Sequence, residues 1–170
     1  MERDELRAIQ APLKERYAEA PEAAQVTLSA SGSLGEGVSC TVDTGRALAE
    51  AGLHPATGGD GSLLCSGDML LEALVACAGV TLRAVATSLG ITVSDGRIRA
   101  EGDLDFRGTL SVSRDAPVGF RDIRLEFKLD TDAGEEELET LIRLTERYCV
   151  VFQSVSSPTP VSASASSQRS

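Results

Sequence analysis

The sequence predicts an α+β fold built from a β-hairpin, a long buried helix, antiparallel strands and a second helix. Three observations predict it. Residues 69–89 are apolar over a helical length and carry only two charged residues, Glu72 and Arg83. Segments on both sides of this stretch alternate apolar and polar residues, as half-buried strands do. Residues 132–148 then place their apolar residues on one face of a helix.

The N-terminal part is expected to form a helix and then a hairpin. Residues 2–19 show helical spacing of apolar residues, and Pro21 closes the helix. Residues 25–31 and 37–43 alternate as two strands around a glycine-rich turn, SGSLGEG. Residues 44–64 are predicted to be a loop.

The central helix has recognisable start and stop signals. Ser66 is the expected N-cap, Asp68 places a carboxylate in the first turn, and Gly90 is the expected C-cap residue. A helix of this length could span a membrane. Its two charges and its many small and hydroxyl side chains instead favour the buried helix of a soluble domain.

The second half is predicted to be mainly strands. They are expected at residues 91–95, 97–108, 109–114 and 120–130, before the helix at 132–148. Val161, Ala163 and Ala165 alternate in the tail, which indicates a last edge strand. We therefore expect an N-terminal helical extension at 1–20, a single domain at 21–165 and a mobile tail at 166–170.

Composition excludes several classes of function. The 170-residue chain has a formal net charge of −10, 4% aromatic residues and no Trp, which disfavours nucleic-acid binding. His54 is the single histidine, so most metal centres and histidine-activated nucleophiles are disfavoured, and no cofactor is expected. The first residues are charged and unlike a signal peptide, so we expect a cytoplasmic protein with reduced cysteines.

The four cysteines, Cys40, Cys65, Cys77 and Cys149, show no C-x-x-C spacing. Cys77 lies in the middle of the central helix, on a face that includes Leu74 and Thr81. Cys149 ends the apolar face of the second helix. Taken alone, each would be interpreted as a small side chain in a packed core.

Two segments change this interpretation. The central helix, SGDMLLEALVACAGVTLRAVATSLGI, resembles the cysteine motif of the OsmC/Ohr family, the osmotically inducible protein C and organic hydroperoxide resistance proteins. The segment LTERYCVVFQSVSSPTPV resembles the second cysteine motif of that family. The order of elements is also similar over most of residues 25–165. The resemblance implies an OsmC-like fold, with antiparallel sheets wrapped around the central helices of an intertwined homodimer.

The resemblance also implies an activity, the thiol-based reduction of organic hydroperoxides or hydrogen peroxide. Cys77 matches the peroxidatic cysteine and Cys149 the resolving cysteine of the family. Cys77 would become a sulfenic acid and then form a disulfide with Cys149. An external dithiol or a low-molecular-weight thiol would reduce that disulfide. No metal, flavin or haem is required.

A cysteine inside an apolar helix needs a nearby cation to form a thiolate, because it gains nothing from a helix N-terminus. In the family, an arginine of the N-terminal hairpin supplies this charge, held by an acidic residue before the central helix. Asp68 matches the acidic position, whereas the hairpin turn contains no arginine. Arg46 is therefore the first candidate, with Arg83 and Arg147 as alternatives.

Two other classes of function remain open from the sequence. A non-catalytic OsmC-like dimer could bind a small apolar ligand or sense oxidation, and the missing hairpin arginine favours this class. An unrelated α+β domain with four structural thiols would not explain both cysteine motifs together.

Overall fold

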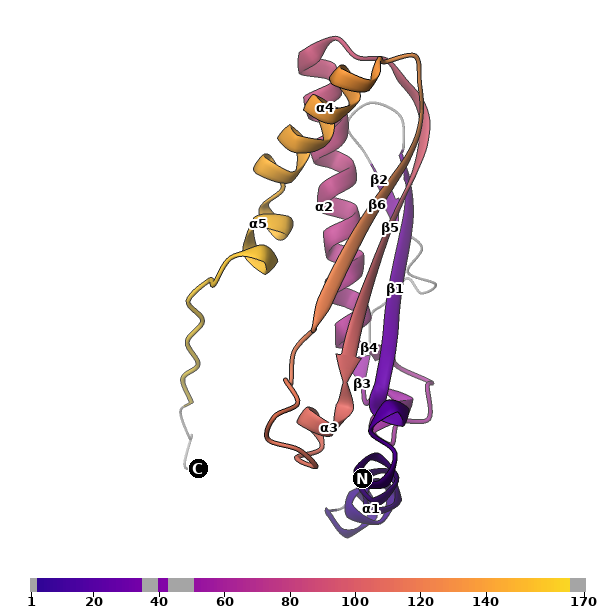
Figure 1. Cartoon of the computed structure of the whole chain (residues 1–170), viewed down its shortest axis with the longest axis vertical. Helices are drawn as coiled ribbons and strands as arrows, with labels where there is room; N and C mark the ends of the chain where they lie inside the picture. Colours follow the sequence, from indigo (N-terminus) through magenta and orange to yellow (C-terminus); the bar gives the residue numbers. More distant parts are fainter. Residues whose placement is uncertain (1–2, 35–39, 43–50, 166–170) are drawn as a thin grey trace, which may run out of the picture.

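The computed structural model describes residues 3–34, 40–42 and 51–165 (Figure 1). In chain order its elements are α1 (Arg3–Glu19), the 3-10 helix η1 (Pro21–Ala24), β1 (Gln25–Leu34), β2 (Cys40–Val42), β3 (Ala51–Gly52), η2 (Pro55–Thr57), β4 (Leu64–Cys65), α2 (Ser66–Leu89), β5 (Val93–Asp105), α3 (Phe106–Thr109), β6 (Asp122–Thr131), α4 (Glu135–Tyr148) and α5 (Val150–Ser156). The predicted α+β class, with an antiparallel sheet and a long central helix, is confirmed.

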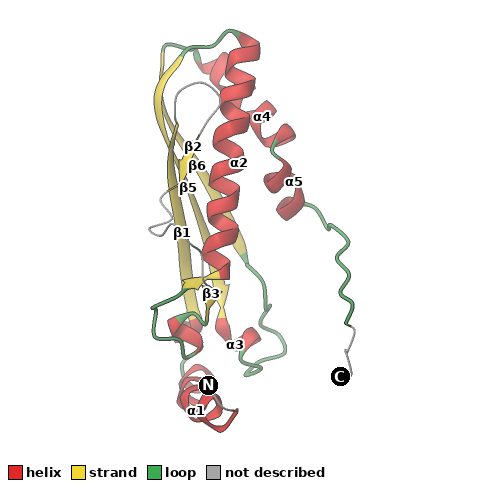
Figure 2. Cartoon of the chain, turned by 180° about the vertical axis from the view of Figure 1, so that it is seen from behind, coloured by secondary structure: helices red, strands yellow, loops and turns green. Residues whose placement is uncertain are grey.

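The main sheet has four antiparallel strands in the order β2-β1-β5-β6. Helix α2 runs along one face of this sheet, and α4 and α5 pack on α2 on the side away from the sheet (Figures 1 and 2). Helix α1 lies beyond one end of the sheet. The cysteine of the central helix is thus placed between a sheet and a C-terminal pair of helices.

The core lies between α2 and the sheet. Leu71, Leu82 and Ile98 are fully buried there, and α2 contacts both β1 and β5. Strand β6 alternates exposed and partly buried residues along its whole length, as its period of two predicts. By length and composition α2 would also pass for a membrane-spanning helix. Its packing on the sheet instead shows the core helix of a folded domain.

The three predicted helices (α1, α2 and α4) and the predicted hairpin of β1 and β2 are confirmed, although some of their ends differ from the prediction. Helix α2 ends at Gly90, whose φ of 73° is the left-handed conformation expected of a C-cap glycine. The N-cap is Cys65 rather than Ser66, which is the first helical residue. Strand β1 continues to Leu34, into the predicted turn, because residues up to Ser33 pair with β5. Sheet pairing therefore overrides the turn preference of these small residues.

Three strand predictions are wrong. The strands predicted at 91–95 and 97–108 are one continuous strand, β5 (Val93–Asp105), which ends where Asp105 caps helix α3. Residues 109–114 are not a strand: Ser111 has a φ of 57°, and the chain turns there. The tail forms no strand over its described part, residues 157–165, and it leads away from the body as an exposed coil.

Candidate functional site

Cys77 and Cys149 lie against each other where α2 meets the C-terminal helices. Cys77 is half-buried in the middle of α2, and Cys149 is fully buried. Cys149 ends α4 and also begins α5, and its Sγ accepts a hydrogen bond of 3.4 Å from the backbone N–H of Phe152. Both thiols are free, and the Cys149 thiol donates a hydrogen bond to Cys77. The structure therefore brings together the two cysteines that the sequence motifs single out.

The surroundings of Cys77 favour its thiolate. Burial raises the pKa of Cys77, but hydrogen bonds outweigh this effect and bring the pKa below its ordinary value. The donors are the backbone N–H of Val151, the Cys149 thiol, the Thr81 hydroxyl and the backbone N–H of Val150. Hydrogen bonds to the charged form of an acid lower its pKa in this way. Cys77 is thus the better nucleophile of the pair.

Cys149 has the opposite environment. The pKa of Cys149 is raised to about 11. Burial is the largest cause, and the hydrogen bond to Cys77 and the charge of Cys77 add to it. The protonated thiol at Cys149 and the thiolate at Cys77 stabilise each other, because one donates the hydrogen bond that the other accepts. The two cysteines are therefore chemically distinct before any reaction.

The sequence led us to expect that Cys77 gains nothing from a helix N-terminus, and this expectation is wrong. The expectation that Cys77 also needs a cation is a separate question. The backbone donors to Cys77 belong to the first residues of α5, a helix that the sequence did not reveal. Main-chain N–H groups carry no residue signature, so no pattern could have indicated them.

The candidate cations lie elsewhere or outside the described residues. Arg46 is outside the described residues, so its predicted role is untested. Arg83 donates through Nη1 to the carbonyl of Val93, and the Arg147 guanidinium lies over the ring of Tyr148, 5.5 Å from its centroid. Within the described part of the chain, the groups that lower the pKa of Cys77 are all hydrogen-bond donors.

Asp68 lies near His54 rather than near Cys77. Burial raises the pKa of Asp68, and the charge interaction with His54 opposes this effect. The His54 ring stacks on Phe106 with centroids 4.9 Å apart, and its Nδ1 accepts a hydrogen bond of 3.0 Å from the backbone N–H of Ala56. Burial lowers the pKa of His54. Asp68 therefore has His54 beside it, and its predicted contact with an arginine is untested.

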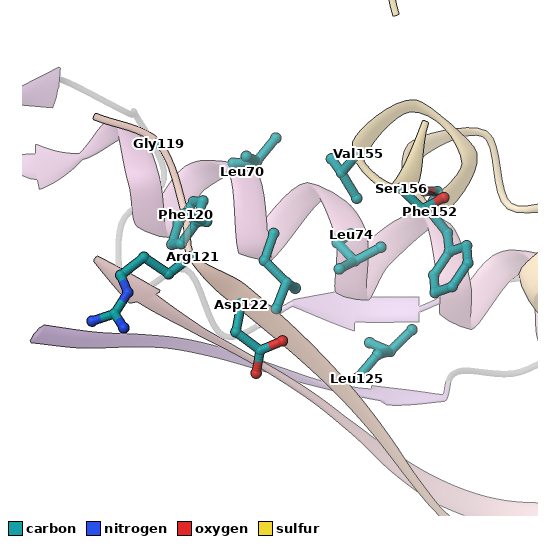
Figure 3. Close-up of a pocket in the computed structure, with 11 residues that line it drawn as sticks. Leu70, Leu74, Gly119, Phe120, Arg121, Asp122, Leu125, Phe152, Val155 and Ser156 are labelled. Carbon is teal, nitrogen blue, oxygen red and sulfur yellow. Dashed lines mark hydrogen bonds between the residues drawn. The ribbon is translucent and has the colours of Figure 1, made fainter. Parts of the chain in front are cut away.

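A mainly apolar groove lies between α2, β6 and α5 (Figure 3). Its volume is about 590 Å³, and it is lined by Leu70 and Leu74 of α2, by β6 and the residues before it, and by Phe152 of α5. Leu74 precedes Cys77 by one helical turn, and the backbone of Phe152 is bonded to Cys149. The sequence analysis did not foresee this groove, because its walls come from three distant segments.

No group of three or more His, Cys, Asp or Glu residues suited to a metal ion occurs within residues 3–34, 40–42 and 51–165. The chemistry that the described site can perform is that of the two thiols. Fold and site together define an α+β protein with a cysteine pair between its central helix and its C-terminal helices.

The chain belongs to the family of OsmC-like proteins, whose sequence profile matches residues 59–164. Among solved structures, it is similar to an OsmC-like hydroperoxide resistance protein from Jannaschia sp. CCS1, at 17% identity and a TM-score of 0.58 over 81% of this chain and 91% of that one. It is also similar to an OsmC-like protein from Mycoplasma pneumoniae, at 19% identity and a TM-score of 0.55, over 79% and 86% of the two chains. These similarities show a shared fold. No curated protein matches the sequence.

Proposed function

We propose that this protein is a thiol peroxidase in which Cys77 reduces organic hydroperoxides and Cys149 resolves the oxidised form. The observation that carries the proposal is the Cys77 sulfur, which accepts hydrogen bonds from two backbone N–H groups and from the Cys149 thiol. The thiolate is the reactive form of a cysteine. Family membership supports the same activity, because the family includes a hydroperoxide resistance protein.

The reaction follows from these positions. The Cys77 thiolate attacks the outer oxygen of the hydroperoxide, an S–O bond forms, the O–O bond breaks, and the leaving alkoxide takes a proton from water. Cys77 is then a sulfenic acid. Cys149 gives its proton to solvent, and its thiolate then displaces the hydroxyl group of the sulfenic acid, which takes a proton from solvent and leaves as water. A Cys77–Cys149 disulfide remains. Two electrons have passed from the two thiols to the peroxide.

The burial of Cys149 has a mechanistic role in this scheme. Its high pKa keeps it protonated while Cys77 is a thiolate, so the two thiols do not compete for the peroxide. Once Cys77 is oxidised, its negative charge is gone and one cause of the raised pKa of Cys149 disappears. Cys149 then becomes a better nucleophile at the moment when the resolving step requires one.

The groove favours an organic hydroperoxide over hydrogen peroxide. Leu70, Phe152 and Val155 offer an apolar surface that a hydrocarbon chain can cover and that hydrogen peroxide cannot use. Leu70 and Leu74 of the groove precede Cys77 on α2 by two helical turns and one, so we expect a chain bound there to bring its peroxide group toward Cys77. We expect cumene hydroperoxide to react faster than hydrogen peroxide, and Val155→Ala, at an exposed position of the groove, to reduce this difference.

We propose that the working form is a homodimer. Five α2 residues besides Cys77 form an exposed or half-exposed strip at alternating spacings of three and four: Leu70, Ala73, Val80, Ala84 and Thr87. This spacing is typical of helices that pack along each other. Leu70 and Val80 are still 38% and 39% exposed in the single chain. A second copy would cover this strip and complete the walls around Cys77.

The proposed cycle ends with thiol–disulfide exchange by an external dithiol or a low-molecular-weight thiol, as the cytoplasm provides. The decisive experiment is the oxidation of the reduced protein with one molar equivalent of cumene hydroperoxide. Two thiols should be lost, and peptide mapping should identify a Cys77–Cys149 disulfide. Cys77→Ser should abolish turnover, whereas Cys149→Ser should stop at the sulfenic acid. A disulfide that excludes Cys77, or no loss of thiols, would overturn the proposal.

The groove also supports a second candidate function, a non-catalytic protein that binds a small apolar ligand. This function requires the groove and makes no use of the hydrogen bonds to Cys77. A fluorescent apolar probe should then bind equally well to wild type and to Cys77→Ser, with no thiols lost after peroxide is added. Sustained consumption of hydroperoxide in the presence of dithiothreitol would favour the peroxidase over the non-catalytic binding protein.

A further inference from the structure

Helix α1 is held on the rest of the protein by the short helix η2, which lies in the loop before α2. Tyr17 of α1 is fully buried, and its hydroxyl donates a hydrogen bond of 2.6 Å to the carbonyl of Ala56. The Nε2 of Gln10 donates a second bond, of 3.3 Å, to the carbonyl of Thr57. Both acceptors belong to η2, and the family profile begins only at residue 59. Helix α1 and its docking site on η2 therefore lie outside the part of the chain that the profile matches.

His54 holds η2 in shape. It is the N-cap residue of η2, and its ring Nδ1 accepts a hydrogen bond of 3.0 Å from the backbone N–H of Ala56. The carbonyl of His54 accepts two further bonds from Thr57, at 2.8 Å from its N–H and at 2.9 Å from its hydroxyl. Stacking on Phe106, with ring centroids 4.9 Å apart, fixes the ring in this position. Because Nδ1 accepts a bond, the neutral ring carries its proton on Nε2.

We propose that His54 is a pH-dependent latch, which keeps α1 docked while its ring is neutral and releases α1 when the ring takes up a proton from water. A protonated imidazole donates from both nitrogens and accepts at neither, so the bond from the N–H of Ala56 to Nδ1 must break. Ala56 also carries the carbonyl that binds Tyr17. The two backbone groups of this one residue therefore couple the protonation of His54 to the docking of α1. The latch makes no use of the thiols and is independent of the function proposed above.

Burial and one carboxylate act on His54 in opposite directions. Burial favours the neutral ring and is the larger effect, so the pKa of His54 lies below its ordinary value of 6.5. The charge of Asp68, in the first turn of α2, favours the protonated ring. Because the pKa is lowered in the folded protein, the docked form is stabilised above pH 6.5 and loses this stabilisation as the pH falls through the lowered pKa. Acid should therefore release α1.

Other charged side chains on the elements around η2 must be separated from His54 in the test. They are Arg16 of α1, Glu22 of η1, Asp60 of the loop, Glu72 of α2, and Asp105 and Arg107 of α3. Hydrogen bonds from Ser62 and Arg107 lower the pKa values of Asp60 and Asp105, so both carboxylates stay charged in mild acid. Burial instead raises the pKa values of Asp68 and Glu72, which brings their protonation closer to that of His54.

The test is hydrogen–deuterium exchange of the full chain at pH 7.5 and pH 4.5, followed by mass spectrometry of the peptides of α1 and of β5. The intrinsic rate of each peptide divided by its observed rate gives its protection at each pH. His54→Asn keeps an acceptor for the N–H of Ala56 that does not titrate, since asparagine is a favoured N-cap residue. His54→Ala removes the acceptor. Glu72→Gln and Asp68→Asn separate the two carboxylates from His54.

We expect the protection of α1 in the wild type to fall roughly fivefold from pH 7.5 to pH 4.5, because one net hydrogen bond is worth about that factor. The protection of β5 should not change, since Ile98 and its neighbours lie in the core. His54→Asn should keep α1 protected at both pH values, and His54→Ala should leave it weakly protected at both. Glu72→Gln should behave like the wild type. Asp68→Asn should show a smaller fall, because it removes the charge that favours the protonated ring.

Three results would overturn the latch: protection of α1 that does not depend on pH in the wild type, a fall of the same size in His54→Asn, or an equal fall in β5, which would mean that acid unfolds the whole domain. A fall that disappears in Glu72→Gln would also overturn it, because the titrating group would then be that carboxylate. If His54→Ala does not fold, the comparison of the wild type with His54→Asn is sufficient. None of these measurements uses peroxide, so a failure of the latch is distinguishable from a failure of the peroxidase proposal.

Discussion

The difference between the two thiols can be tested without any peroxide. The pKa of Cys77 lies below its ordinary value of 9.0, and that of Cys149 is raised to about 11. A gap of about two units or more means that, at pH 8 and below, the thiolate fraction of Cys77 exceeds that of Cys149 by roughly 100-fold or more. Complete burial of Cys149 slows its reaction further.

The assay is alkylation of the reduced protein at pH 8 with a limiting amount of iodoacetamide, followed by quantification of both cysteine peptides. Cys77 should be modified at least about 100 times faster than Cys149. In Cys77→Ser, one cause of the raised pKa of Cys149 is removed, so the midpoint of Cys149 alkylation should move down. Burial, its largest cause, remains, so the midpoint should stay above 9.0.

Equal rates for the two cysteines would refute the reasoning, and so would a Cys149 midpoint that does not change in Cys77→Ser. Cys149→Ala completes the design. It removes a donor to Cys77, so the midpoint of Cys77 should rise, although the backbone donors Val150 and Val151 remain in place.

Three further predictions concern stability and substrate preference. Tyr17→Phe removes a buried hydroxyl that donates to the carbonyl of Ala56 at 2.6 Å, and urea denaturation should show a loss of about 1 kcal/mol. Hydrogen bonds from Arg124, together with one from a neighbouring threonine, lower the pKa of Asp103 to about 2. Because the folded-state pKa is depressed, this stabilisation is present above pH 4 and is lost as the pH falls toward 2. Arg124→Ala should therefore lower the melting temperature at pH 7 and leave it unchanged at pH 2. Phe152→Ala should raise the KM for cumene hydroperoxide more than that for hydrogen peroxide, whereas Val118→Ala, at an exposed position outside the groove lining, should change neither.

The long periodic elements of this fold are predictable from the sequence because each has one buried face. The apolar positions of α2 and α4 repeat at helical spacing, and those of β6 at a spacing of two. The short elements escape prediction. Residues 109–114 alternate like a strand, but the cap at Asp105 and the turn at Ser111 take them out of the sheet.

Only the side-chain groups of the candidate site can be predicted from the sequence, and its main-chain groups cannot. Cys77 and Cys149 are found from their motifs, and Thr81 can be placed on the face of Cys77 by helical spacing alone. The donors of Val150 and Val151 cannot be found in this way, because they are main-chain groups on a seven-residue helix whose β-branched residues do not favour helix formation. The expectation that Arg46 activates Cys77 is untested, because Arg46 lies outside the described residues.

Cys149, Val150 and Val151 are consecutive in the chain, yet they include the thiol proposed to resolve the oxidised form and two of the groups that lower the pKa of Cys77. In the proposed mechanism, activation and resolution therefore depend on one tripeptide and cannot be separated by recombination or by moving a loop. One inserted residue between Tyr148 and Val150 would displace all three groups at once. An engineer who transplants this site onto another scaffold must carry the tripeptide as a unit, with the helix junction that fixes its direction.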